Sequence, residues 1–128
     1  GMFGSCTSLT SVPLFDTSNV TYMGNMLSSC TSLTSVPLFD TSNVTDMGAM
    51  FDSCTSLTSI PLFNTSSVTN MMLMFSGCSK VESGALALYQ QASTQANPPT
   101  NHYYCFYNCG RDTVTGAAEL AQIPSDWK

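Results

Sequence analysis

Charged residues are scarce in this sequence. Among its 128 residues, eight are Asp or Glu and three are Lys or Arg, so charged residues make up 9% of the chain, where about 25% is typical of soluble domains. The three basic residues, Lys80, Arg111 and Lys128, all follow residue 79. Nucleic acids and anionic membrane surfaces are bound by clusters of Lys and Arg. The sequence therefore argues against nucleic acid as a partner and contains no polybasic membrane patch.

Long apolar runs and catalytic motifs are also missing. No apolar run approaches about 18 residues, the length that a membrane-spanning helix needs, so no membrane insertion is expected. Histidine occurs once, at His102, and no G-x-S-x-G motif is present, which leaves no basis for a Ser-His-Asp arrangement. We predict that the protein is not an enzyme and has no catalytic residues. An active site in the aromatic C-terminal segment is the remaining enzymatic alternative.

What the chain does contain is a repeat of 24 residues. Residues 2–25 read MFGSCTSLTSVPLFDTSNVTYMGN, residues 26–49 read MLSSCTSLTSVPLFDTSNVTDMGA, and residues 50–73 read MFDSCTSLTSIPLFNTSSVTNMML. A fourth copy begins at Met74 and diverges after Cys78. The apolar content of 43% is ordinary, so the repeats can bury one core as one domain. The chain begins inside the pattern, which suggests that Gly1 is a tag remnant ahead of a fragment of a longer array.

Three patterns follow one another within each unit. Leu9, Val12 and Leu14 have a spacing that suits a short strand with inward-facing apolar side chains. The segment DTSN at 16–19 favours a turn. Apolar residues within 20–30 recur at helical spacing and predict a short helix. Such a unit is too small to bury its own apolar face, so equivalent residues are expected to stack about 4.8 Å apart.

Proline conflicts with part of this interpretation. Pro13, Pro37 and Pro61 occupy the expected strand in the three units, and proline cannot donate a ladder hydrogen bond. We therefore expect the strands to be very short, with the pairing made by the residues that flank each proline.

The motifs M-F-x-x-C-T-S-L-T-S-V-P-L and F-D-T-S-N-V-T-x-M, which recur over residues 2–81, resemble the BspA-like leucine-rich repeats of bacterial surface proteins. The resemblance implies an α/β repeat fold: a right-handed leucine-rich-repeat solenoid with short parallel strands, short helices and a C-terminal helical cap. It also implies an extracellular place, on a cell surface or a phage fibre, and a role in adhesion. The usual asparagine ladder has no clean equivalent here. Its work falls either to Asp16, Asp40 and Asn64 or to Asn19, Asn43 and Ser67.

Two regions of one structural domain are expected. Residues 1–80 form the repeat array, with three full repeats and the start of a fourth, and residues 81–128 form a degenerate last repeat and a cap. Residues 83–92 and 116–122 are interpreted as helices, with Ser83 as a plausible N-cap of the first. The rings of the tyrosines and tryptophan in this region are expected to cover the end of the core; they are Tyr89, Tyr103, Tyr104, Tyr107 and Trp127. The N-terminal end has no such cap and could self-associate.

Six cysteines raise the question of disulfides and metals. Cys6, Cys30, Cys54 and Cys78 share one repeat position, and we interpret them as a buried ladder of thiols that act as small hydrophobes. A bridge between stacked neighbours stays possible by distance. Cys105 and Cys109 permit either a bridge or, with His102, a weak zinc signal. We predict no metal site and no cofactor. Asp16, Asp40 and Asn64 are expected to cap turns rather than to bind cations.

The expected strand face is the candidate binding surface. Its outward hydroxyl residues are Thr10, Ser11, Thr34, Ser35, Thr58 and Ser59. Repeats present such faces as extended binding surfaces, and rows of hydroxyls with few charges suit a glycan or an extended polypeptide. Two hypotheses follow. Either the protein is a non-catalytic recognition or adhesion module for a host protein or surface glycan, or it is a structural spacer or fibre segment with no ligand of its own.

Overall fold

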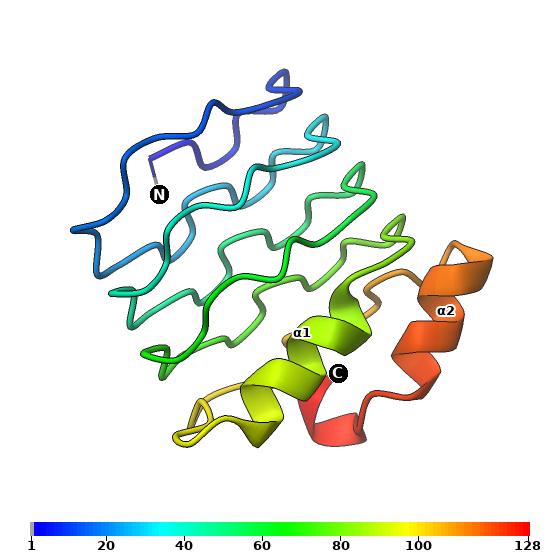
Figure 1. Cartoon of the computed structure of the whole chain (residues 1–128). Coiled ribbons are helices and arrows are strands. Elements are labelled where there is room, and N and C mark those ends of the chain that lie inside the picture. Colours follow the sequence, from blue (N-terminus) through cyan, green and yellow to red (C-terminus); the bar gives the residue numbers. More distant parts are fainter. Residues whose placement is uncertain (1) are drawn as a thin grey trace.

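The computed structural model describes residues 2–128, and Gly1, together with its interpretation as a tag remnant, lies outside the described residues. The repeats form flattened coils of 24 residues that stack side by side, and helices close the C-terminal end of the stack (Figure 1). Residues 2–25, 26–49 and 50–73 make coils 1, 2 and 3, and a fourth, interrupted coil follows. None of the helices within residues 2–128 is long and apolar enough to cross a membrane.

The helix expected within residues 20–30 does not form. Instead, consecutive tight turns occupy residues 24–29, with Asn25 and Ser29 at φ angles of 59° and 60°. A left-handed residue in each turn redirects the chain, so the i to i−4 bonds of an α-helix cannot build up. Every second N–H points to the next coil, and the others bond within the turn, as in the bond from Met26 to Met23 over 3.2 Å.

The bonds between coils form a ladder with one direction. In coil 1, the N–H groups of Met23, Asn25, Leu27 and Ser29 donate to the carbonyl oxygens of Asp46, Gly48, Met50 and Asp52 over 2.7–2.9 Å. The equivalent N–H groups of coil 2 donate in the same way to coil 3, and those of coil 3 donate to residues 101–107. Each coil is therefore joined to its neighbour along this side without forming a strand.

The expected parallel strands are also absent. Within residues 2–128 the extended segments pair only through isolated parallel bridges, of which Ser59 with Ser83 is the one on the expected strand face. The prolines at 13, 37 and 61 remove donors from this side, and the remaining bonds are sparse, such as Thr58 N–H to Thr34 O over 3.1 Å. The prediction of a right-handed leucine-rich-repeat solenoid with parallel strands and repeat helices was therefore wrong.

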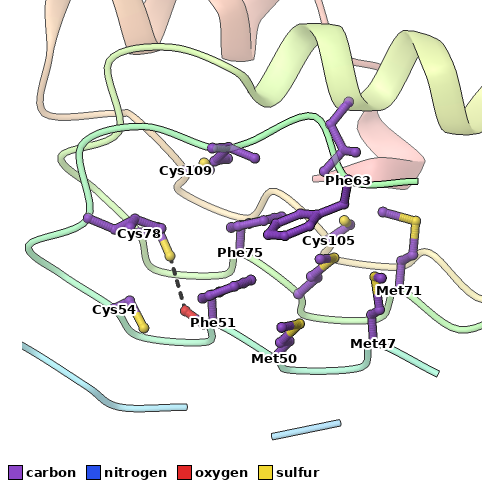
Figure 2. Close-up of a cluster of buried hydrophobic side chains, with 14 of the residues drawn as sticks. Met47, Met50, Phe51, Cys54, Phe63, Met71, Phe75, Cys78, Cys105 and Cys109 are labelled. Carbon is purple, nitrogen blue, oxygen red and sulfur yellow. Dashed lines mark hydrogen bonds between the residues drawn. The ribbon is translucent and has the colours of Figure 1, made fainter. Parts of the chain in front are cut away.

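Equivalent apolar side chains form columns inside the coils. Met47, Met50, Leu57 and Phe63 of coil 2 and coil 3 are fully buried, as are the cysteines of the same columns. The phenylalanines stack on one another: Phe51 lies 5.9 Å from Phe63 and 5.1 Å from Phe75, measured between ring centroids. Figure 2 shows these rings lying over one another between the methionine and cysteine columns. The repeat thus builds one continuous core along the stack.

Three short helices close the C-terminal end. They are α1 (Ala85–Thr94), α2 (Val114–Ala121) and the 3-10 helix η1 (Ser125–Trp127). Helix α1 begins after Gly84, at a φ of 104°, and not at a capping Ser83. A Cβ at Gly84 would collide with the carbonyl oxygen of Ile60, so a glycine is needed where the chain leaves the stack. Glu119 of α2 accepts a hydrogen bond from the N–H of Leu86 over 3.0 Å and thereby caps α1.

Helix α1 takes the place of a further coil on its side of the stack. The side chain of Gln91 donates to the carbonyl oxygen of Phe63 over 2.6 Å, and Gln95 donates to that of Thr65 over 2.8 Å. Trp127 ends the aromatic column, with its ring stacked 4.3 Å from that of His102. The expected covering role of Tyr103, Tyr104 and Tyr107 was wrong, because all three are exposed.

Candidate binding surface

The six predicted hydroxyl residues lie on one exposed side of the coils. All of them, Thr10, Ser11, Thr34, Ser35, Thr58 and Ser59, are solvent-exposed. The threonines stand in register: the N–H of Thr34 donates to the carbonyl oxygen of Thr10 over 3.4 Å, and the N–H of Thr58 donates to that of Thr34 over 3.1 Å. The hydroxyl of Thr58 donates to the same Thr34 oxygen over 3.2 Å. We call this set the hydroxyl face.

The serines of the hydroxyl face are the less constrained members. Within residues 2–128, the side chains of Ser11, Ser35 and Ser59 make none of the recorded hydrogen bonds, whereas most other hydroxyls of the repeats bond to a neighbouring coil or turn. A hydroxyl both donates and accepts, so each serine can bond a ligand without breaking a bond inside the protein.

A row of leucines beside the hydroxyl face was not foreseen. Leu14, Leu38 and Leu62 are 66%, 58% and 51% exposed, although the repeat pattern predicted that they would face the core. Val12 and Phe15, which are three residues apart, turn inward instead. Proline favours the polyproline II conformation, with three residues per turn, so the Pro-Leu pair points outward. The signal in the sequence was the proline inside the expected strand.

Turn residues border the leucine row. The carboxylate of Asp40 accepts hydrogen bonds from the N–H and the hydroxyl of Ser42 over 3.0 Å and 2.6 Å, and Asp16 bonds Ser18 in the same way. The Ser42 hydroxyl and then its N–H lower the pKa of Asp40 below its usual value. Asn64 makes equivalent bonds to Ser66 over 3.0 Å and 2.7 Å. The expectation that these residues cap turns is confirmed.

Backbone carbonyls between coils are satisfied by two rows of side chains. The predicted pair Asn43 and Ser67 bond the carbonyl oxygens of Ser18 and Ser42 over 2.7 Å and 2.9 Å. A second row was missed. Buried Thr17 and Thr41 donate to the carbonyl oxygens of Asp40 and Asn64, each over 2.7 Å, and Thr65 donates to the side chain of Gln95 over 2.8 Å. The invariant T in the D-T-S-N motif was the available signal.

The cysteine column is buried and reduced. All six cysteines are free, and all but Cys6 are buried, which confirms the predicted ladder of buried thiols. Burial raises the pKa of the thiols of Cys30, Cys78 and Cys105, and it raises the pKa of Cys54 and of Cys109 to about 12. Neither a bridge between stacked neighbours nor a Cys105–Cys109 bridge is formed. Residues 2–128 contain no group of three His, Cys, Asp or Glu side chains placed to hold a metal ion.

His102 has a structural environment. Its ring lies parallel to that of Trp127, with an interplanar angle of 4°, and its Nδ1 lies 3.2 Å from the carbonyl oxygen of Asp126. The ring therefore helps to fix the C-terminal segment on the end of the core. The partners of His102 recorded for residues 2–128 include no nucleophilic side chain.

Comparison with known proteins gives a family. A family model described as "Mycoplasma protein of unknown function, DUF285" matches residues 1–110. A search of the curated proteins finds no match. Among solved structures, the crystal structure of a leucine-rich-repeat protein from T. pallidum is 17% identical, with an alignment over 94% of this chain and 73% of that chain and a TM-score of 0.30. This TM-score is too low to indicate a shared fold.

Proposed function

The chain belongs to the DUF285 family of mycoplasma proteins of unknown function, and on that premise we propose that it is a non-catalytic recognition module that binds a host protein or glycan through the hydroxyl face. The observation that carries the proposal is the free and regular hydroxyl row, in which Ser11, Ser35 and Ser59 stand exposed on three successive coils. Spacing set by the coil stack places these groups in a fixed array, which reduces the ordering cost of binding.

The leucine row supports the same proposal. An exposed row of Leu14, Leu38 and Leu62 beside the hydroxyl face gives an apolar strip next to a hydrogen-bonding strip. Specific sites combine apolar contact area with a few placed polar groups. The repeat motifs also support placing the protein among BspA-like surface proteins, with a location on a cell surface or a fibre, where contact with a host partner would occur.

The test is a binding screen of the purified chain against arrays of glycans and extracellular matrix proteins. The variant Thr34→Ala, Ser35→Ala, Thr58→Ala, Ser59→Ala removes hydroxyls from the middle of the face. The control variant Thr45→Ala, Ser66→Ala, Ser67→Ala, Thr69→Ala removes four exposed hydroxyls outside it. We expect capture that the first variant loses and the control retains. Equal capture by both variants would reject the hydroxyl face, and no capture by the wild type would favour a structural spacer.

The proposal includes self-association through coil 1. Its outer side carries an apolar cavity of about 380 Å³ that includes Met2, Phe15 and Val20 in its lining, and no coil within residues 2–128 covers it. A second copy could cover it with the same surface, as in a two-fold dimer. Sedimentation should show association that increases with concentration. Met2→Asp should weaken it, whereas Val114→Asp, at an exposed apolar site on α2, should not.

A further inference from the structure

A hollow on another side of the coils suggests a second site. Tyr22, Asp46 and Asn70 occupy the same position in coils 1, 2 and 3, where parallel bridges join Tyr22 to Asp46 and Asp46 to Asn70. An open cavity of about 260 Å³ lies over these positions. We call it the turn-face trough, because the tight turns after each of the three residues form its floor (Figure 1).

Small residues make the trough. Coil 2 has Gly48 and Ala49 in the turn, whereas coil 3 has Met72 and Leu73 at the same positions, so the surface rises at coil 3. A Cβ on Gly48 would lie 2.8 Å from the Nδ2 atom of Asn70. A glycine is therefore needed for the Asn70 side chain to lie across coil 2 and reach Asp46.

The floor of the trough carries a fixed carboxylate. Oδ1 of Asp46 accepts the N–H of Gly48 over 2.8 Å, and the Nδ2 atom of Asn70 lies 3.2 Å from both carboxylate oxygens. The two oxygens of a carboxylate offer about four acceptor positions, so further positions remain for hydroxyl donors of a ligand. Because Asp46 is already held in place, little side-chain entropy is lost when a ligand binds.

Exposed aromatic rings flank this carboxylate. Tyr22 lines one end of the trough and is 58% exposed. Beyond Met72, the next coil presents Tyr103 and Tyr104, which are 55% and 56% exposed. Their position follows from the ladder, since the N–H of Leu73 donates to the carbonyl oxygen of Tyr103 over 3.2 Å. Tyrosine offers an apolar ring face and a polar hydroxyl at low conformational cost.

The same features disfavour other ligand classes. The N–H groups of Met23, Asn25, Met47 and Ala49 already donate to the next coil, so a peptide cannot add as a further strand on this side. The lining contains no Lys or Arg, which disfavours phosphate and carboxylate ligands. A pyranose ring presents apolar C–H faces and a rim of hydroxyl groups, and this combination matches rings beside a carboxylate.

We infer that the turn-face trough binds a neutral saccharide, with Asp46 accepting hydrogen bonds from ring hydroxyls and Tyr22 packing against a sugar face. The volume fits part of a ligand rather than a large molecule, so one or two rings of a longer chain would occupy it. The inference rests on the proposed recognition function. It names a ligand class and a site that is separate from the hydroxyl face.

Two variants test the site while preserving the coil. Asp46→Asn gives coil 2 the residue that coil 3 carries, and Asn70 makes the equivalent turn bond to the N–H of Met72 over 2.9 Å. Tyr22→Asp gives coil 1 the residue of coil 2. Both variants are therefore expected to fold. The probes are the neutral tetrasaccharides of glucose, mannose, galactose and N-acetylglucosamine, with binding followed by saturation-transfer NMR and by titration at millimolar concentrations.

We expect at least one tetrasaccharide to bind, and each variant to weaken that binding by about tenfold or more, because hydrogen bonds to a charged group and aromatic contacts have this size. The four-alanine variant of the hydroxyl face should retain it. Binding lost only in the four-alanine variant would overturn the trough and leave the proposed function standing. Capture of matrix proteins without any tetrasaccharide binding would overturn the saccharide class. If the wild type captured nothing on either array, both proposals would fail.

Discussion

The thiol of Cys78 donates a hydrogen bond to the carbonyl oxygen of Phe51, which lies 27 residues earlier, over 3.1 Å (Figure 2). The same bond joins Cys54 to Leu27 and Cys30 to Phe3, each over 3.1 Å. Each cysteine therefore both fills a core position and contacts a carbonyl oxygen of the preceding coil. A thiol is a weak donor and a small hydrophobe, so this residue suits a column that is mostly apolar.

Thiol reactivity should follow this burial. We expect one of the six thiols, the exposed Cys6, to react quickly with a water-soluble disulfide reagent at neutral pH, because the thiolate is the reactive form and burial raises the pKa of Cys54 to about 12. The other five should react only on unfolding. Cys6→Ser should leave no fast thiol. A second fast thiol in that variant would contradict the buried column.

The leucines of coil 2 allow a matched test of packing. Leu33 is fully buried and Leu38 is 58% exposed. Leu33→Ala should lower the free energy of unfolding by about 2–5 kcal/mol because it leaves a cavity. Leu38→Ala should change it by about 0.5 kcal/mol or less. Urea unfolding measures both. Equal losses would mean that Leu38 packs inward, as the sequence pattern first predicted.

The buried threonine row can be tested in the same coil. Thr41 donates to the carbonyl oxygen of Asn64 over 2.7 Å in a buried position. Thr41→Val should cost about 1–3 kcal/mol of unfolding free energy, because the carbonyl loses its partner away from water. Thr45 also bonds a carbonyl oxygen, that of Thr21 over 3.1 Å, but it is exposed. Thr45→Val is the control and should have little effect, since water replaces the lost donor.

Stability should fall in acid partly through the turn aspartates. Hydrogen bonds from Ser18 and Ser42 lower the pKa of Asp16 and Asp40 below 3.8 in the folded chain. Their contribution is therefore present above the unfolded pKa and is lost as the pH falls through the folded pKa. The double variant Asp16→Asn, Asp40→Asn should fold and should unfold with less pH dependence below about pH 5. An unchanged acid slope would contradict this role.

The coil stack, the core columns and the two C-terminal helical regions were readable from the sequence, because a repeat of 24 residues forces equivalent residues to stack. The helix within residues 20–30 was not readable in the same way. Inward columns at Met23 and Met26 fit a helix and a chain of tight turns equally well. Gly77 occupies the position of Ser29 and Ser53 and has a φ of 74°. That glycine was the one sign that this position requires a left-handed conformation.

The site was only partly foreseeable for a related reason. Exposure of the six hydroxyl residues followed from their polar character. The outward turn of Leu14 depended on Pro13, whose effect on residue period competes with the alternation of a strand. The turn-face trough depends on the rise from Gly48 to Met72 between neighbouring coils. A pattern within one repeat cannot show it, because the feature exists only between repeats.

The near-identity of coils 1 and 2 has a consequence for how the chain reaches this structure. Residues 2–25 and 26–49 differ at four positions, and both can accept the same partners from residues 50–73. A refolding chain can therefore pair coil 3 directly with residues 2–25 and leave residues 26–49 looped out, at an entropic cost that grows only slowly with loop length. The distinctive C-terminal sequence, anchored by Gly84 and Trp127, is then the reference point from which correct order along the stack is counted.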